Sequence, residues 1–122
     1  KKYETKVNFI TGNIEEINLS QTDIVILDKS LCCYPSISKI ITNSSKSCNE
    51  YYGFIIPRTD RYVNLISKIF CFFLSIVSKL RGNSLVYIHD IKIIHSILTE
   101  SGLRKIFQKS SGIWSIFLYK KL

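Results

Sequence analysis

The chain has 122 residues, of which 46% are hydrophobic, with two prolines and five glycines. These values exclude a disordered chain and predict one globular domain over residues 1–122. The net charge is +8, and residues 62–122 hold nine Lys/Arg against two Asp/Glu, whereas residues 1–61 hold eight against seven. This imbalance indicates either an anionic partner, such as a membrane surface or nucleic acid, or simply solvated lysines in a lysine-rich chain.

Two strands are predicted at the start of the chain. Residues 7–11 form a short β-type run that stops at Gly12, and residues 13–16 open a polar connection. Residues 22–28 then place four consecutive aliphatic residues ahead of an acid. A short apolar run of this kind predicts a parallel strand that is buried on both faces.

A loop with polar residues follows this second strand. Ligands of open α/β sheets bind just beyond the carboxyl ends of the strands. Asp28, Lys29 and the loop from Leu31 to Tyr34 are therefore candidate site residues.

A helix and a third strand come next. The stretch after Pro35 has isoleucines on one helical face and fades into polar residues at 43–45. Residues 51–56 form another apolar β-type run, which Pro57 ends. A strand, a helix and a strand in succession imply a parallel pair.

The longest apolar stretch of the chain lies within residues 62–81. At 100° per residue, the polar side chains fall on one arc of about 120° and the apolar ones on the other side. Two lysines and a full polar arc suit a bilayer core poorly. The pattern therefore predicts an amphipathic helix packed on a sheet rather than a membrane span.

The last third of the chain predicts one more helix and a β-hairpin. Asp90 is an N-cap candidate for a helix over residues 91–101, and Gly102 is its stop. Two β-type runs, residues 103–109 and 113–120, then flank a Ser-Ser-Gly turn. The chain is thus expected to end in an antiparallel pair.

The four cysteines, Cys32, Cys33, Cys48 and Cys71, form no C-x-x-C pair. Adjacent cysteines point apart in an extended chain and suit a tetrahedral zinc site poorly. We expect reduced thiols in a cytoplasmic protein and no metal site.

Alternating strands and helices that end in an antiparallel pair resemble the class I S-adenosylmethionine (SAM)-dependent methyltransferases, whose sheet ends in a reversed hairpin. Nearly the whole chain carries this resemblance. Residues 7–16 are similar to the third strand and its glycine–acid turn, 23–35 to the fourth strand and active-site loop, 52–58 to the fifth strand, and 102–118 to the final helix, strand, turn and strand. The resemblance implies an α/β fold with a partial Rossmann-like sheet and a terminal antiparallel β-hairpin.

The resemblance also implies SAM as the cofactor and a site for its adenine at Gly12, Asn13 and Ile14. Family members usually hold the adenine amine with an acid after the third strand. Asn13 stands at that position, and its side-chain carbonyl can accept the same hydrogen bond without a charge. The backbone N–H groups of Asn13 and Ile14 are expected to serve the ring nitrogens.

Three residues after the fourth strand, Asp28, Lys29 and Leu31, are expected to meet the amino acid portion and the sulfonium of SAM. A carboxylate there suits a cation. Each of these motifs by itself is weak evidence for the family. The resemblance rests on their order and spacing taken together.

Candidates for catalysis and acceptor binding come from three other segments. His89 stands before a helix and is a candidate base, although a capping neighbour or packed ring is the commoner role. Tyr34 and Arg58 follow strand ends and are expected either to line an acceptor pocket or to pack a loop. Methyl transfer depends mainly on positioning, so no residue type is obligatory.

The chain departs from the family in one large respect. The first strand with its glycine-rich turn and the second strand with its ribose-binding acid belong upstream of these residues. The chain therefore resembles the C-terminal portion of one methyltransferase domain, and the strand at residues 7–11 would have no sheet neighbour within it. We expect this portion alone to bind SAM negligibly and to be inactive.

The expected function is methyl transfer to a small-molecule acceptor as part of a longer chain. The Cys-Cys-Tyr-Pro loop, the Pro-Arg pair and the helix over residues 62–81 look most similar to small-molecule methyltransferases, including those near magnesium-protoporphyrin O-methylation. The alternative is a basic, non-enzymatic module that uses residues 62–81 on a membrane surface or another anionic partner. Nucleic acid is not expected, because aromatic residues lie within apolar runs rather than among basic residues.

Overall fold

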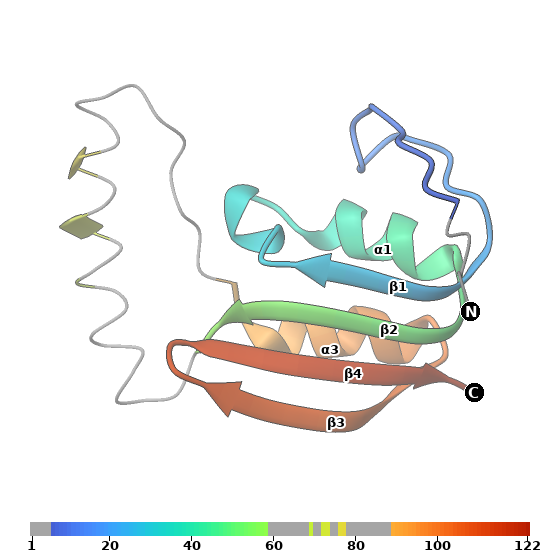
Figure 1. Cartoon of the computed structure of the whole chain (residues 1–122). Coiled ribbons are helices and arrows are strands. Elements are labelled where there is room, and N and C mark those ends of the chain that lie inside the picture. Colours follow the sequence, from blue (N-terminus) through green and yellow to red (C-terminus); the bar gives the residue numbers. More distant parts are fainter. Residues whose placement is uncertain (1–5, 59–68, 70–71, 74–75, 78–88) are drawn as a thin grey trace, which may run out of the picture.

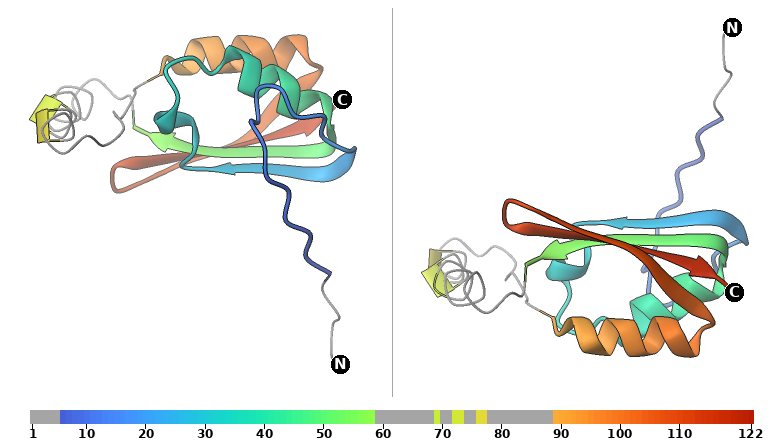
Figure 2. Two further views of the ribbon diagram at one scale, coloured as in Figure 1. Left: turned by 90° about the horizontal axis from the view of Figure 1, so that it is seen from above. Right: turned by 90° about the horizontal axis from the view of Figure 1, so that it is seen from below.

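The computed structural model describes residues 6–58, 69, 72–73, 76–77 and 89–122. Within these ranges a four-stranded sheet carries two α-helices, and both helices lie on the same face of it (Figures 1 and 2). The elements in chain order are β1 (Thr22–Asp28), η1 (Leu31–Cys33), α1 (Ser38–Lys46), β2 (Cys48–Pro57), α3 (Ile91–Glu100), β3 (Leu103–Ser111) and β4 (Trp114–Lys121).

The strand order is β1-β2-β4-β3. β1 and β2 are parallel and are joined through α1, whereas β4 runs antiparallel to both β2 and β3. The α/β class, the parallel pair and the terminal antiparallel hairpin are thus confirmed. β1 and β3 form the two opposite edges of the sheet.

Helix α1 continues beyond the polar residues at which the sequence pattern fades. It ends at Lys46, and Ser44 and Ser45 within it are buried. The Ser44 hydroxyl lies 2.7 Å from the carbonyl oxygen of Ile40 and 2.7 Å from the hydroxyl of Tyr52. The expected end at residues 43–45 was wrong, because buried serines that find partners are compatible with a helix.

Helix α3 has the ends that its sequence predicts. The Asp90 carboxylate accepts a hydrogen bond from the backbone N–H of Lys92 at 2.9 Å, as an N-cap does. After the helix, Gly102 adopts a φ of +82°, which glycine reaches without the Cβ penalty of other residues.

The hairpin turn lies one residue later than the sequence suggests. Ser111 pairs with Trp114, so the turn consists of Gly112 and Ile113. Gly112 has a φ of +60°, and a positive φ at the first turn residue alone is typical of a type II′ turn.

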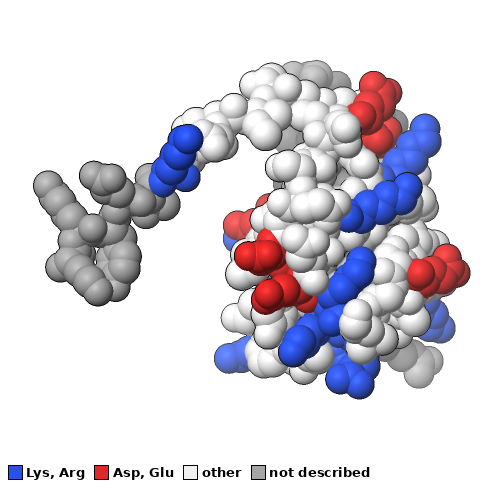
Figure 3. All heavy atoms as spheres, turned by 90° about the vertical axis from the view of Figure 1, so that its right-hand side faces the viewer, with Lys and Arg blue, Asp and Glu red and all other residues white. Residues whose placement is uncertain are grey.

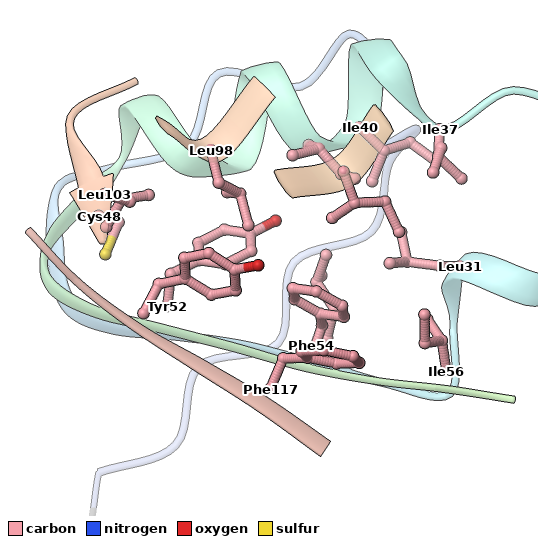
Figure 4. Close-up of a cluster of buried hydrophobic side chains, with 14 residues drawn as sticks. Leu31, Ile37, Ile40, Cys48, Tyr52, Phe54, Ile56, Leu98, Leu103 and Phe117 are labelled. Carbon is pink, nitrogen blue, oxygen red and sulfur yellow. The ribbon is translucent and has the colours of Figure 1, made fainter. Parts of the chain in front are cut away.

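Aromatic rings from the two central strands form the middle of the core. Phe54 stacks on Phe117 and Tyr119, with ring centroids 5.0 and 5.8 Å apart, and meets Tyr52 edge-on at 6.5 Å. Figure 4 shows these rings below aliphatic side chains of the helices and of η1, among them Leu31, Ile40 and Leu98. This packing attaches both helices to one face of the sheet.

The opposite face of β1 is not covered, in contrast to the expected burial on both faces. Leu27 points toward the helices and is buried, whereas Ile24 and Ile26 are 56% and 67% exposed. β1 is an edge strand, and the described helices lie on one face only (Figure 2). The aliphatic run therefore alternates between a buried and an open side.

The strand predicted at residues 7–11 is absent. This segment belongs to no sheet, Phe9 is 94% exposed, and residues 6–11 project away from the sheet in Figure 2. A strand needs a neighbour for its backbone hydrogen bonds, and none of the described strands offers one here. The sequence analysis expects residues 7–11 to have no neighbouring strand within this chain. This explains why they form no strand.

Most of the helix predicted over residues 62–81 lies outside the described residues. Five residues there, at positions 69, 72, 73, 76 and 77, are helical, and their apolar side chains are exposed. The expected packing of this apolar face on the sheet is therefore not found for them. Within the described part of the chain, no helix is both long and apolar enough to cross a bilayer.

Charged side chains of both signs are mixed on the surface. On the side shown in Figure 3, Lys and Arg side chains lie among Asp and Glu side chains. On this side the positive charge is dispersed rather than gathered into one basic surface.

Two buried tyrosines are expected to make the fold sensitive to alkali. Burial raises the pKa of Tyr52 above its usual range and that of Tyr119 to about 12. An unfolded tyrosine has a pKa of about 10. The folded state therefore holds these protons more tightly, and this stabilisation is complete below pH ~10 and is lost as the pH rises through ~12.

The check is urea unfolding, followed by circular dichroism, between pH 8 and pH 11.5 for the natural chain and Tyr119→Phe. At pH 8 the free energy of unfolding of the variant should be about 1 kcal/mol lower than that of the natural chain. The reason is that the substitution removes the Tyr119 hydroxyl, which bonds His95. The variant should then lose less stability than the natural chain above pH 10. An equal loss in both proteins would contradict the assignment to Tyr119.

Candidate functional site

The carboxyl end of β1 makes a sharp turn at Lys29. Its φ of +53° is in the left-handed region, which residues other than glycine rarely adopt. The turn brings the Lys29 ammonium over the ring of Trp114, 5.0 Å from its centroid. Asp28, just before the turn, is exposed and pairs with Ile55 of β2. Two charged residues, Asp28 and Lys29, therefore lie at the carboxyl ends of the two parallel strands.

Leu31 anchors the loop that follows. The whole residue is buried in the core, so neither its side chain nor its backbone is exposed to a ligand. The Leu31 carbonyl oxygen lies 2.9 Å from Nε2 of His89. A carbonyl can only accept a hydrogen bond, so Nε2 donates, and the lone pair of a neutral His89 ring is then on Nδ1. Nδ1 is therefore the atom of His89 that can act as a base.

Arg58 joins the end of β2 to the hairpin turn. Its backbone N–H donates to the carbonyl oxygen of Ile113 at 2.7 Å, and its Nη1 donates to that of Gly112 at 3.3 Å. Tyr34, at the other side of the loop, is half-buried and packs against the core. The structure thus brings five of the predicted residues to one end of the sheet: Asp28, Lys29, Leu31, Arg58 and His89.

Gly12, Asn13 and Ile14 lie elsewhere in the structure. The carbonyl oxygen of Ile14 accepts a hydrogen bond at 2.8 Å from the side-chain amide of Asn43, which is in the second half of α1. Helix α1 leads from the carboxyl end of β1 back to the amino end of β2, so Asn43 lies away from the carboxyl ends (Figure 1). The Asn13 side-chain oxygen accepts from the backbone N–H of Glu15 at 3.1 Å. The predicted adenine turn is therefore docked on α1 and not beside Asp28.

Sequence reasoning missed Trp114. This residue is the single tryptophan of the chain, and it lies within the β-type run predicted over residues 113–120. Its place follows from strand register, because Trp114 pairs with Pro57 and so lies at the carboxyl end of β2. A tryptophan directly after a hairpin turn is the signal that could have identified it.

Two cysteines, Cys32 and Cys33, lie near this end of the sheet, whereas Cys48 lies at the amino end of β2. The Cys32 thiol donates to the carbonyl oxygen of Lys29 at 3.1 Å, and Cys33 is exposed. Cys48 is buried, and this burial raises the pKa of its thiol. Among the residues that the structure describes, no three His, Cys, Asp or Glu side chains form a group that could hold a metal ion.

The arrangement was compared with known proteins. No protein family model matches the sequence, and no curated protein matches it. Solved structures do match. Magnesium protoporphyrin IX methyltransferase from Synechocystis PCC 6803, crystallised with bound SAH, superimposes with a TM-score of 0.70 and 17% identity over 93% of this chain and 51% of that one.

Two further structures agree. An O-methyltransferase family protein from Burkholderia thailandensis has a TM-score of 0.71 and 14% identity over 93% of this chain and 35% of that one. A SAM-dependent methyltransferase from Methanosarcina mazei has a TM-score of 0.72 and 14% identity over 99% of this chain and 70% of that one. The fold is that of SAM-dependent methyltransferases.

The likeness covers nearly all of this chain but not the whole of the methyltransferases it matches. The chain spans about half the length of the Synechocystis enzyme, at 51%. In the described sheet, β1 is an edge strand and one of its faces is uncovered. Further strands and helices of a methyltransferase-like domain have space to pack there.

Proposed function

We propose that this chain is the C-terminal portion of a SAM-dependent methyltransferase domain that acts on a small-molecule acceptor. The observation that supports it most is the strand order β1-β2-β4-β3 with antiparallel β4, which superimposes over 93% of the chain on a methyltransferase crystallised with SAH. The proposal includes a longer chain whose remaining part supplies the other strands. The 122 residues alone are proposed to be inactive.

The cofactor is proposed to lie at the carboxyl ends of β1 and β2. Bound SAM supplies an electrophilic methyl group on a positively charged sulfur. The exposed carboxylate of Asp28 would attract the positively charged α-ammonium and sulfonium of SAM, and the backbone of the Lys29 turn would hold its α-carboxylate. Residues 12–14 contact the adenine only if they leave α1, which is proposed to occur when the remainder of the domain is present.

The acceptor is proposed to lie beside the same end of the sheet. His89 would take the proton of the acceptor on Nδ1, because Nε2 donates to Leu31. Arg58 and Tyr34 would border the acceptor, with Arg58 positioned through its bonds to the hairpin turn. Two proteins with this fold support a small-molecule acceptor: one has magnesium protoporphyrin IX in its name, and another was crystallised with apigenin.

Calorimetry with SAM tests the proposal. The 122-residue chain should show no micromolar binding, whereas the chain extended by the codons before Lys1 should bind. In the extended chain, Asp28→Asn should weaken binding about tenfold, because a charge-assisted contact is lost. Asp23→Asn is the matched control, since Asp23 is an exposed acid near the other end of β1, and it should leave the affinity unchanged.

Two outcomes would contradict this function. One is an extended chain that folds but does not bind SAM. The other is equal weakening by Asp28→Asn and Asp23→Asn, which would place the cofactor away from the carboxyl end of β1.

A further inference from the structure

A cleft of about 380 Å³ lies between α3 and the β3–β4 hairpin. This is at the β3 edge of the sheet, whereas the candidate methyltransferase site involves β1 at the opposite edge. Its volume is within the range of roughly 300–1,000 Å³ that is usual for small-molecule sites. The lining residues are Ile91, Lys92, His95 and Ser96 of α3, and Lys105, Gln108, Ser115, Phe117 and Tyr119 of the hairpin.

Strand β3 presents polar side chains to the helix side of the sheet, where β2 and β4 present aromatic rings. Lys105 pairs with Tyr119, and Gln108 pairs with Phe117, so each polar residue stands beside a ring of the core. Burying apolar side chains would be the ordinary use of this face. The polar side chains on this face of β3 indicate a solvated surface with a function rather than an extension of the hydrophobic core.

A β-bulge in β3 brings Lys105 and Gln108 to the same face. In a regular strand, residues three apart point to opposite faces. The register shifts between Lys105 and Phe107, and the Lys105 ammonium donates to the side-chain oxygen of Gln108 at 2.9 Å. Bulges re-aim side chains in this way beside functional sites. Gln108 thereby positions the Lys105 charge over the cleft.

Helix α3 adds a second set of polar groups opposite β3. Lys92, His95 and Ser96 lie three and four residues apart and so share one face of the helix. His95 is oriented by the Tyr119 hydroxyl, which lies 3.1 Å from its Nδ1. No acidic residue lines the cleft among the residues that the structure describes, so two lysine charges stand there without a lining carboxylate.

Aromatic side chains are among the residues that line the cleft. Phe117 and Tyr119 are buried, and both stack on Phe54 of the neighbouring strand β2. Figure 4 shows the rings of Phe54 and Phe117 beside each other. Cationic and aromatic side chains together suit a ligand that has a flat apolar body and a negative charge at one end.

We propose that the cleft between α3 and the β3–β4 hairpin binds a small aromatic carboxylate. The ring lies against the exposed imidazole of His95 and the accessible edge of Phe117, and the carboxylate lies between Lys92 and Lys105. The residues that line this cleft are not those of the proposed methyltransferase site, and the proposal does not depend on the function proposed above.

A titration of the ¹⁵N-labelled 122-residue chain with 2-naphthoate, followed by amide chemical shifts, tests the proposal. Shifts should concentrate in residues 91–96, 105–108 and 115–119. Lys105→Gln should weaken binding about tenfold, since a charge-assisted contact is removed. Lys109→Gln is the matched control, because Lys109 is on the same strand and pairs with Ile116 on the other face, and it should leave binding unchanged.

Neutral 2-naphthalenemethanol separates the charge from the ring and should bind at least about tenfold more weakly than 2-naphthoate. Lys92→Gln repeats the test from the helix side if Lys105→Gln alters the spectrum of the whole chain. The absence of shifts in the three segments would overturn the proposal. Equal binding of the neutral compound, or equal weakening by Lys109→Gln, would also overturn it.

Discussion

Phe54→Ala is expected to lower the free energy of unfolding by about 3–5 kcal/mol. Phe54 is 1% exposed, and its ring stacks on the rings of Phe117 and Tyr119, which come from β4. Alanine would leave a cavity under both helices, and the surrounding rings cannot close it because strand pairing holds them in place. Urea unfolding followed by circular dichroism measures the loss.

Ile26→Ala is the control for this substitution. Ile26 is 67% exposed on the uncovered side of β1, so its truncation should change the free energy of unfolding by no more than about 0.5 kcal/mol. A large loss from Ile26→Ala would show that this face is covered in solution. A small loss from Phe54→Ala would contradict the aromatic core. Phe54→Leu, which leaves a smaller cavity, extends the test if the alanine variant does not fold.

Leu31→Ala is expected to lower the free energy of unfolding by about 2–5 kcal/mol. Leu31 nevertheless lies in the loop that was predicted to contact the cofactor. The side chain is fully buried with Ile37 and Ile40, whereas a side chain that waits for a ligand would be accessible. The loss should also loosen the loop, because the Leu31 carbonyl holds His89. Thermal and urea unfolding of the variant measure the change.

Cys33→Ala provides the comparison within the same short helix. Cys33 is exposed, so this variant should keep the stability of the natural chain within about 0.5 kcal/mol. If both variants unfold at the same urea concentration as the natural chain, the side chain of Leu31 is not part of the core and is free for a ligand.

The class of the fold could be predicted from the sequence because its signals are local. The apolar runs of β1 and β2, the N-cap at Asp90 and the glycines at 102 and 112 each act within a few residues. The order of strands and helices then leaves few arrangements of the sheet. The parallel pair β1–β2 and the terminal antiparallel hairpin agree with this prediction.

The errors arose where a distant segment decides the outcome. Residues 7–11 have a strand pattern, but their backbone groups have no neighbouring strand among the described elements. Ser44 looks like the end of a helix, but the Tyr52 hydroxyl provides it with a buried partner. Neither effect can be read from residues close in the sequence.

The candidate site was likewise predictable from the sequence only in part. The sequence by itself determined which chemical groups follow each strand: Asp28 and Lys29 after β1, Arg58 after β2, and His89 before α3. Only the tertiary structure decided that Lys29 lies over Trp114, that His89 donates to Leu31, and that the Ile14 carbonyl is bound to α1. The reason is physical: strand and helix preferences depend on neighbouring residues, whereas burial and side-chain partners depend on which elements pack together.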